Sequence, residues 1–233
     1  MPELQDQPAL TIQGLRHRYA PNQPPSLIVP ELVLNTSEQM VLTGSSGSGK
    51  STLLHLIAGL MDPSEGTIRV AGTCPQSLRG QARDKFRGRT IGMVFQTHHL
   101  LMGFSALENV MAALMFSDIP RGSHRARAKS LLDTLGIATP DQRVERLSVG
   151  QQQRVAIARA LACDPVLVLA DEPTASLDPE NAQAALDLLQ QACRSSGSAL
   201  LCVTHDTRLI NRFDRNQHLP APHEQLQETG GGA

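Results

Sequence analysis

The sequence predicts an α/β fold in which a parallel β-sheet is covered by helices on both faces. Short apolar runs alternate with helical patterns along most of the chain, which is typical of parallel sheets. A Gly/Ser-rich loop at 44–51 stands between an apolar strand and a helical pattern. A second apolar run, at 166–170, ends in Asp171 and Glu172. Ligands of open α/β sheets bind at such strand ends, so this edge is the expected site.

The composition is that of a globular chain, with 40% hydrophobic and 18% charged residues. A net charge of −1 argues against non-specific nucleic-acid binding, so no nucleic-acid partner is expected. The first residues lack the basic and apolar regions of a signal peptide, and no apolar run reaches the ~18 residues that a membrane span needs. Four cysteines without C-x-x-C spacing predict reduced thiols in a cytoplasmic protein.

The first third of the chain predicts strands joined by turns. Residues 1–8 are polar and expected to form a loose tail. Alternating and apolar runs predict strands at 10–19, 26–34, 40–43 and 67–70. The first two flank a Pro-rich turn, and a helical pattern after the Gly/Ser loop closes at Gly59.

The middle of the chain predicts a mostly helical insertion at about 97–160, which follows a strand at 91–95. Ser105 and Glu108 form a capping box, and a further helix is expected from about residue 123 until Gly136. Alternation then resumes with strands at 166–170 and 199–204, and Asp178-Pro179 opens a helix between them. From residue 216 to 233 the chain is polar, and no structure is assigned there.

The loop at 44–51 fits the phosphate-binding pattern G-x-x-x-x-G-K-[ST]. Its backbone N–H groups and the following helix N-terminus would cradle phosphates, with Lys50 reaching the β and γ phosphates and Ser51 holding Mg²⁺. The strand before it and the helix after it disfavour a plain surface turn. The predicted nucleotide contacts here are Gly44, Ser45, Ser46, Gly47, Ser48, Gly49, Lys50, Ser51 and Thr52.

Two further elements carry polar groups at ends of secondary structure. Asp171 would act on Mg²⁺ and Glu172 would orient or deprotonate the attacking water, although alone they would also suit a helix start. Ser148-x-x-Gln151 is a capping box for a helix at 150–162. A capped helix N-terminus is also an anion site, so the structural and functional roles are compatible.

Taken in order, these motifs resemble those of an ATP-binding cassette (ABC) ATPase over about residues 9–215. The resemblance implies a RecA-like P-loop NTPase core, an N-terminal antiparallel β subdomain and a helical signature subdomain. A polar C-terminal tail would follow from residue 216. The matching set is Tyr19, 44–51, Gln96, 147–151, Asp171-Glu172, Ser176-Leu177-Asp178 and His205.

The resemblance also implies roles for single residues. Tyr19 would stack on adenine, Gln96 would touch Mg²⁺ or the water and sense a membrane partner, and His205 would contact the γ-phosphate. Asp178 would communicate across a dimer, besides capping its helix. The groups that would face the ATP of a second copy are Ser148, Gly150 and Gln151. Val149 departs from the family's usual Leu-Ser-Gly-Gly-Gln; it is permitted if its φ is negative, so activity is expected to be kept. What the departure puts in question is the local fit, and thus the rate.

Residues 87–96 and 98–110 further resemble the lipoprotein-releasing, macrolide-exporter and division-associated (LolD, MacB and FtsE) types, with Met102 in place of their usual proline. The predicted protein is the ATP-hydrolysing subunit of an ABC transporter, a homodimer bound to integral membrane permease subunits at the cytoplasmic face of the plasma (inner) membrane. Its work would be export, lipoprotein release or mechanotransmission.

Two alternatives remain at this point. A soluble ABC ATPase acting on DNA or ribosomes usually has two cassettes or long insertions, and an unrelated P-loop kinase or switch would not need Gln96 and His205. The basic stretch at 79–89 could meet anionic lipid or nucleic acid, but Asp84 interrupts it, which favours a solvated helix face.

Overall fold

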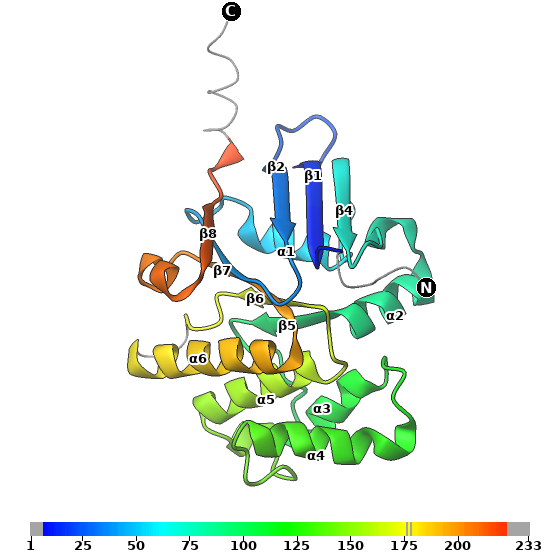
Figure 1. Ribbon diagram of the computed structural model, residues 1–233, viewed down its shortest axis with the longest axis vertical. Helices are drawn as coiled ribbons and strands as arrows, with labels where there is room; N and C mark the ends of the chain where they lie inside the picture. Colours follow the sequence, from blue (N-terminus) through cyan, green and yellow to red (C-terminus); the bar gives the residue numbers. More distant parts are fainter. Residues whose placement is uncertain (1–6, 176, 178, 223–233) are drawn as a thin grey trace, which may run out of the picture.

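Two sheets and a group of helices are stacked along the long axis of the computed structural model (Figure 1). The structure describes residues 7–175, 177 and 179–222 of the 233. A small antiparallel sheet lies at one end, a parallel sheet lies near the centre, and the helices of the middle third lie at the other end. This arrangement confirms the predicted α/β fold class, with its antiparallel subdomain and helical insertion.

The antiparallel sheet has the strand order β2-β1-β4. Its strands are β1 (Leu10–His17), β2 (Leu27–Leu34) and β4 (Glu65–Val70). Leu10, Ile12 and Leu15 of β1 are fully buried, as expected for a sheet with one face on the core. Gly66 is required by a close approach, because a Cβ there would stand 2.4 Å from the carbonyl oxygen of Gly14.

The parallel sheet has the strand order β5-β6-β7-β3-β8. Its strands are β3 (Gln39–Thr43), β5 (Ile91–Phe95), β6 (Leu167–Asp171), β7 (Ala199–Thr204) and β8 (Arg215–His218). Every residue of β3 and β7 is buried, which is typical of parallel strands covered on both faces. Since all strands run the same way, the phosphate loop, Gln96, Glu172 and His205 follow strand ends along one edge.

Six α-helices and four 3₁₀ helices surround the sheets in the described part of the chain. The α-helices are α1 (Lys50–Ile57), α2 (Gly80–Thr90), α3 (Ala106–Leu114), α4 (His124–Thr134), α5 (Val149–Leu161) and α6 (Pro179–Ser196). The 3₁₀ helices are η1 (Pro75–Ser77), η2 (Arg121–Ser123), η3 (Val144–Arg146) and η4 (Thr207–Arg212). Helices α3, α4 and α5 contact one another and form the helical subdomain.

The parallel sheet separates two hydrophobic clusters. Val168 and Ala170 of β6 belong to the cluster that reaches the helical subdomain. Leu167 and Leu169 of the same strand belong to the cluster beneath α1 and the antiparallel sheet. Successive side chains of a strand point to opposite faces of the sheet. One face of the sheet therefore packs beneath α1, at the nucleotide edge, and the other face packs toward the helical subdomain.

The C-terminal part of the sheet differs from the prediction. The sequence analysis assigns no structure from residue 216, which is wrong for β8: this strand pairs in parallel with β3, with Thr43 opposite His218. Its four residues are polar, and they are half-buried or exposed at the sheet edge. Backbone pairing with β3 therefore forms this strand, and an apolar pattern could not have revealed it.

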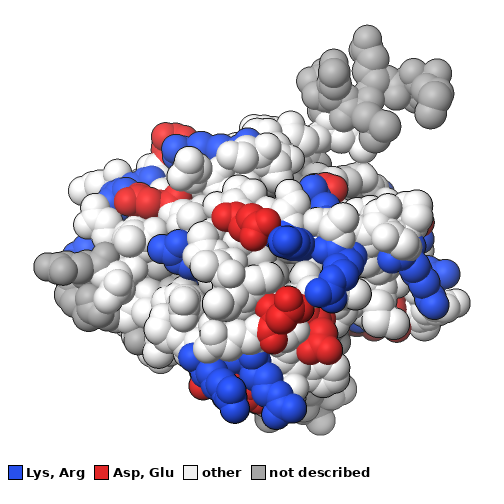
Figure 2. All heavy atoms as spheres, turned by 90° about the horizontal axis from the view of Figure 1, so that it is seen from below, with Lys and Arg blue, Asp and Glu red and all other residues white. Residues whose placement is uncertain are grey.

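The basic stretch at 79–89 lies on and around α2, which has no buried residue. Arg83 pairs with Asp62, Arg87 with Asp84, and Arg89 with Asp118. On the face seen from below, acidic groups stand among the basic ones (Figure 2). These pairs support the interpretation of α2 as a solvated helix.

Two other predictions concern cysteines and membrane spans. All four cysteines are free thiols, as predicted. Burial raises the pKa of Cys163 to about 11 and that of Cys193 to about 12, so both thiols stay protonated and unreactive near neutral pH. None of the helices in the described ranges has both the length and the apolar character needed to cross a bilayer.

Candidate nucleotide site

The phosphate loop joins β3 to α1 and depends on close backbone packing. Gly47 and Gly49 have φ of 80° and 94°, a region that glycine adopts without strain. A Cβ on Gly44 would stand 2.6 Å from Ser48 Oγ and 2.7 Å from the carbonyl oxygen of Leu219. The loop therefore brings backbone N–H groups together at the N-terminus of α1, an arrangement that binds anions.

Lys50 carries a positive charge into this loop. Its ammonium donates to the carbonyl oxygens of Gly44 at 2.8 Å and Ser45 at 2.9 Å. The residue is only 9% exposed. Both carbonyl groups are neutral, so they do not neutralise the positive charge of the buried Lys50 ammonium. A negatively charged phosphate oxygen bound in the loop would neutralise it.

One pocket collects most of the predicted nucleotide and catalytic residues. Its walls come from the end of β1, the start of β2, the phosphate loop, and the ends of β6 and β7. The lining residues are Tyr19, Ser26, Ser46, Gly47, Gly49, Lys50, Ser51, Thr52, Asp171, Glu172 and His205. Ser26 was not singled out from the sequence; its N–H donates to the carbonyl oxygen of His17 and closes the Pro-rich turn.

Tyr19 stands beside the loop with 63% of its surface exposed. Its hydroxyl lies 2.7 Å from Thr52 Oγ1, within hydrogen-bond distance. The His17 ring meets it edge-on, with ring centroids 5.1 Å apart and planes at 86°. These two contacts restrain the tyrosine, and its exposed ring suits stacking on a flat base.

Glu172 is held tightly at the end of β6. Its φ of 46° is unusual for a residue with a side chain, and such strain persists only where neighbours stabilise it. Its N–H donates to the carbonyl oxygen of Val203 at 3.0 Å. The carboxylate accepts hydrogen bonds from Thr204 Oγ1 at 2.9 Å and from the N–H of His205 at 2.9 Å, and it lies 2.7 Å from His205 Nδ1.

Thr204 is thus a site residue that the sequence analysis missed. The available signal was a hydroxyl residue next to His205 at the end of a buried strand. Gln96 lies along the same edge: it follows Phe95, which pairs with Asp171, but it does not line the pocket.

The N-terminus of α5 carries the capping box predicted from the sequence. Ser148 Oγ accepts from the N–H of Gln151 at 3.3 Å, and Gln151 Oε1 accepts from the N–H of Ser148 at 3.0 Å. Val149 begins the helix without a positive φ, and it is 50% exposed. The helix therefore accepts Val149 where the pattern departs from two glycines.

The same helix end is separate from the pocket. Among the described lining residues there is no Ser148, Gly150 or Gln151. A Cβ on Gly150 would meet no atom of its own chain within 4 Å. Asp178, the other residue predicted to act across a dimer, lies outside the described residues.

The phosphate loop joins β3 to α1, and the carboxylates Asp171 and Glu172 stand at the end of β6, which is separated from β3 by β7 alone. This arrangement is that of a P-loop ATPase. The chain belongs to the ABC transporter family, whose profile matches residues 30–175. It is an ATP-binding cassette with the ATPase activity of that family, which confirms the resemblance seen in the sequence.

The similar proteins support this assignment along most of the chain. The lipoprotein-releasing system ATP-binding protein LolD of Anaeromyxobacter dehalogenans is 47% identical over 212 residues, covering 89% of each chain. LolD of Pseudomonas fluorescens is 44% identical over 194 residues, covering 83% of this chain and 86% of its own.

Solved structures agree with the fold. The dimeric bacterial ABC transporter cassette MJ0796 has a TM-score of 0.80 and 32% identity, covering 91% of this chain and 95% of its own. A post-hydrolysis dimer of MJ0796, bound to ADP and Pi, has a TM-score of 0.78, also at 32% identity, covering 90% of this chain and 94% of its own.

Proposed function

We propose that this chain drives a lipoprotein-release type of ABC complex as a Mg²⁺-ATP-dependent homodimer. It would bind permease subunits at the cytoplasmic face of the inner membrane. The observation that carries the proposal is the N-terminus of α5, which is folded and exposed but does not line the pocket of its own chain. The identity with LolD proteins supports the branch.

ATP would be bound from its base to its γ-phosphate by one chain. Tyr19 stacks on the base, and residues 44–52 surround the phosphates with backbone N–H groups and Lys50. The exposed ring of Tyr19 and the uncompensated charge of Lys50 in one pocket support this orientation.

The residues at the pocket also suit Mg²⁺. Ser51 and Asp171 line it together, and Gln96 would add an amide oxygen from the neighbouring strand end. The described residues hold no cluster of three or more metal-binding side chains of the His, Cys, Asp or Glu type. This fits Mg²⁺, which commonly takes one or two protein oxygens and completes its shell with phosphates and water. Bound Mg²⁺ would neutralise phosphate charge.

Glu172 would orient the attacking water and accept its proton, while His205 would contact the γ-phosphate. The contacts of Glu172 with Thr204 and His205 keep its carboxylate at the pocket wall. General bases act within hydrogen-bond reach of the proton that they remove, so a carboxylate fixed at the pocket wall supports the role proposed for Glu172.

A second copy would complete the site. Ser148, Gly150 and Gln151 of one protomer would face the γ-phosphate held by its partner, and Asp178 would lie in the same interface. The open space around Gly150 supports this, because a glycine permits close approach of a phosphate from outside the chain.

A cytoplasmic segment of a permease would dock on the helical subdomain. Besides Val149 at the start of α5, five large apolar side chains there are exposed: Leu101, Met102, Phe104, Met115 and Phe116. An adjoining groove is lined by residues that include Phe95, His99, Phe116 and Arg159. Exposed apolar side chains beside a groove are typical of protein interfaces.

Affinity purification of the full chain from detergent-solubilised membranes tests this proposal. The expected result is co-purification of an integral membrane protein, which is reduced by Phe116→Ser and unaffected by Leu60→Ser, another exposed apolar residue outside the subdomain. Recovery with DNA or ribosomes, and with no membrane protein, would support the soluble alternative instead.

A further inference from the structure

The turn after β5 has an unusual backbone. His98 and His99 are consecutive and have φ of 58° and 46°, in the left-handed region that side chains disfavour. The N–H of His98 donates to the carbonyl oxygen of Phe95 at 3.1 Å. Gln96 and Thr97 are therefore the central residues of this turn. A strained turn of this kind keeps its shape only where neighbouring groups hold it.

Arg159 of α5 supplies such a restraint. Its guanidinium donates to the carbonyl oxygens of His98 at 2.7 Å and His99 at 2.5 Å. A planar guanidinium places two N–H groups in a fixed geometry, so it can hold two adjacent carbonyls at once. The His99 ring also stacks on Phe95, with centroids 4.7 Å apart.

His98 adds to this packing, because the residue is buried and its carbonyl oxygen accepts the hydrogen bond from Arg159.

We propose that Arg159 is a positioning residue for Gln96. By holding the carbonyl groups of His98 and His99, it stabilises the turn that presents Gln96 at the end of β5. Phe95 pairs with Asp171 in the sheet, so the next residue lies at the edge that carries the catalytic groups. The inference rests on the role proposed above for Gln96.

The arrangement also joins two parts of the catalytic machinery. Arg159 is on α5, whose N-terminus carries Ser148 and Gly150. A helix rises about 1.5 Å per residue, so one rigid element of roughly 16 Å connects that N-terminus to the Gln96 turn. A displacement of α5 would therefore move both.

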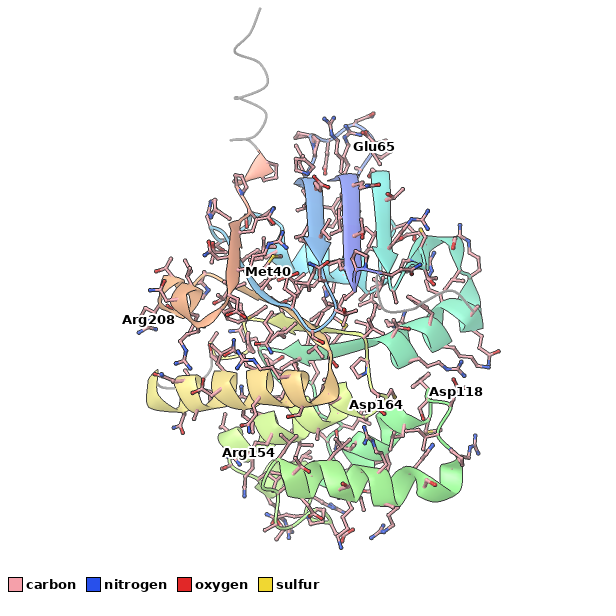
Figure 3. The ribbon with its side chains drawn as sticks, viewed as in Figure 1. Met40, Glu65, Asp118, Arg154, Asp164 and Arg208 are labelled. Atoms are coloured by element: carbon pink, nitrogen blue, oxygen red, sulfur yellow. The ribbon has the colours of Figure 1, made fainter. Side chains whose placement is uncertain are left out.

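The test is Arg159→Lys in the full-length chain. Lysine keeps the charge but cannot hold both carbonyls in the same fixed geometry. The expected result is a fall in kcat of about 10- to 100-fold, as for other small displacements of positioned groups, with the KM for ATP changed less than about twofold. Arg154→Lys is the matched control, because Arg154 projects from the same helix and donates to the carbonyl oxygen of Leu135 at 3.0 Å (Figure 3). It should leave kcat within about twofold of the parent value.

A glycine rescue separates turn positioning from general stability. Glycine adopts a positive φ freely, so His99→Gly should restore much of the kcat that Arg159→Lys loses. His99→Gly alone is the reference for this rescue, because it removes the ring stacked on Phe95 but lets residue 99 keep its positive φ without strain. Loss of kcat in Arg154→Lys equal to that in Arg159→Lys, or no recovery with glycine, would overturn the inference.

Gln96→Ala distinguishes this inference from the proposed function. If Gln96→Ala lowers kcat and Arg159→Lys does not, the inference is wrong while the proposed role of Gln96 stands. If Gln96→Ala leaves kcat unchanged, the role of Gln96 is wrong and the inference fails with it.

Discussion

The edge of the parallel sheet and the N-terminus of α5 are both predicted to contact ATP. They differ in whether a single chain brings their polar groups together in a nucleotide pocket. At the sheet edge, Lys50 and Glu172 are bonded to neighbouring groups and line a common pocket. At α5, the described side-chain hydrogen bonds of Ser148 and Gln151 join these two residues to each other, and Gly150 faces open space. The N-terminus of α5 is fully folded, but it does not line the nucleotide pocket of its own chain. This contrast with the sheet edge supports a nucleotide site that a second chain completes.

The largest expected effect is at the sheet edge. Glu172→Gln should lower ATP hydrolysis by roughly 10²- to 10⁴-fold, the usual value of a positioned acid or base, while ATP still binds. The ATP-bound dimer should then persist and be detected by light scattering. Glu145→Gln changes an exposed carboxylate in η3 and should hydrolyse ATP normally. Normal hydrolysis by Glu172→Gln would refute its catalytic role.

The second-largest effect is expected for Lys50→Ala. It should bind ATP about 10- to 100-fold more weakly, because it loses charge-assisted hydrogen bonds to phosphate. Titration with a fluorescent ATP analogue measures it. Lys129→Ala, which removes an exposed lysine of α4, is the control and should bind normally. Unaltered affinity in Lys50→Ala would contradict the assignment of the phosphate loop.

A matched pair of caps sharpens the comparison. Ser105 and Ser148 both cap helices through complete capping boxes. Replacing either serine by alanine should cost about 1 kcal/mol of unfolding free energy. Only Ser148→Ala should also weaken ATP-dependent dimerisation, by about tenfold, because only its hydroxyl would meet a phosphate. Equal dimerisation of the two variants in Glu172→Gln backgrounds would count against the shared site.

The smallest effect concerns the turn that connects the two regions. Burial, and after it the nearby Arg159 guanidinium, lowers the pKa of His98 from its ordinary value of 6.5. Near this pH the folded state therefore binds fewer protons than the unfolded state. Stability should therefore be full above pH 6.5 and should fall as the pH drops below it. His98→Asn, which tolerates a positive φ, should show a smaller decrease in Tm between pH 7.5 and 5.5. An identical decrease in both proteins would contradict this origin.

The sequence was sufficient for features that depend on local pattern. The phosphate loop, both capping boxes and the strand ending at Asp171 follow from short runs of residues with a clear physical requirement. The tolerance of Val149 also followed, because a helical backbone suits any residue with negative φ.

Features that depend on distant contacts could not be predicted. Strand β8 has the polar sequence Arg-Asn-Gln-His and exists through pairing with β3, more than 170 residues earlier. Arg159 reaches carbonyl groups 60 and 61 residues away, and backbone carbonyls leave no mark in a sequence. The hydrogen bond from Thr204 to Glu172 likewise requires β6 and β7 to be neighbours.

Mixing two defective variants tests most directly the claim that two chains share each site. Lys50→Ala damages the phosphate loop, and Gly150→Ala adds a methyl group that has space in its own chain but would obstruct a partner's phosphate. Neither should hydrolyse ATP alone. In a mixed dimer, one site would combine both defects and the other would have neither. Mixing should therefore restore ATPase activity to about a quarter of the wild-type rate, since about half of randomly paired dimers are mixed and each has one intact site. Activity no greater than the sum of the separate variants would contradict the account.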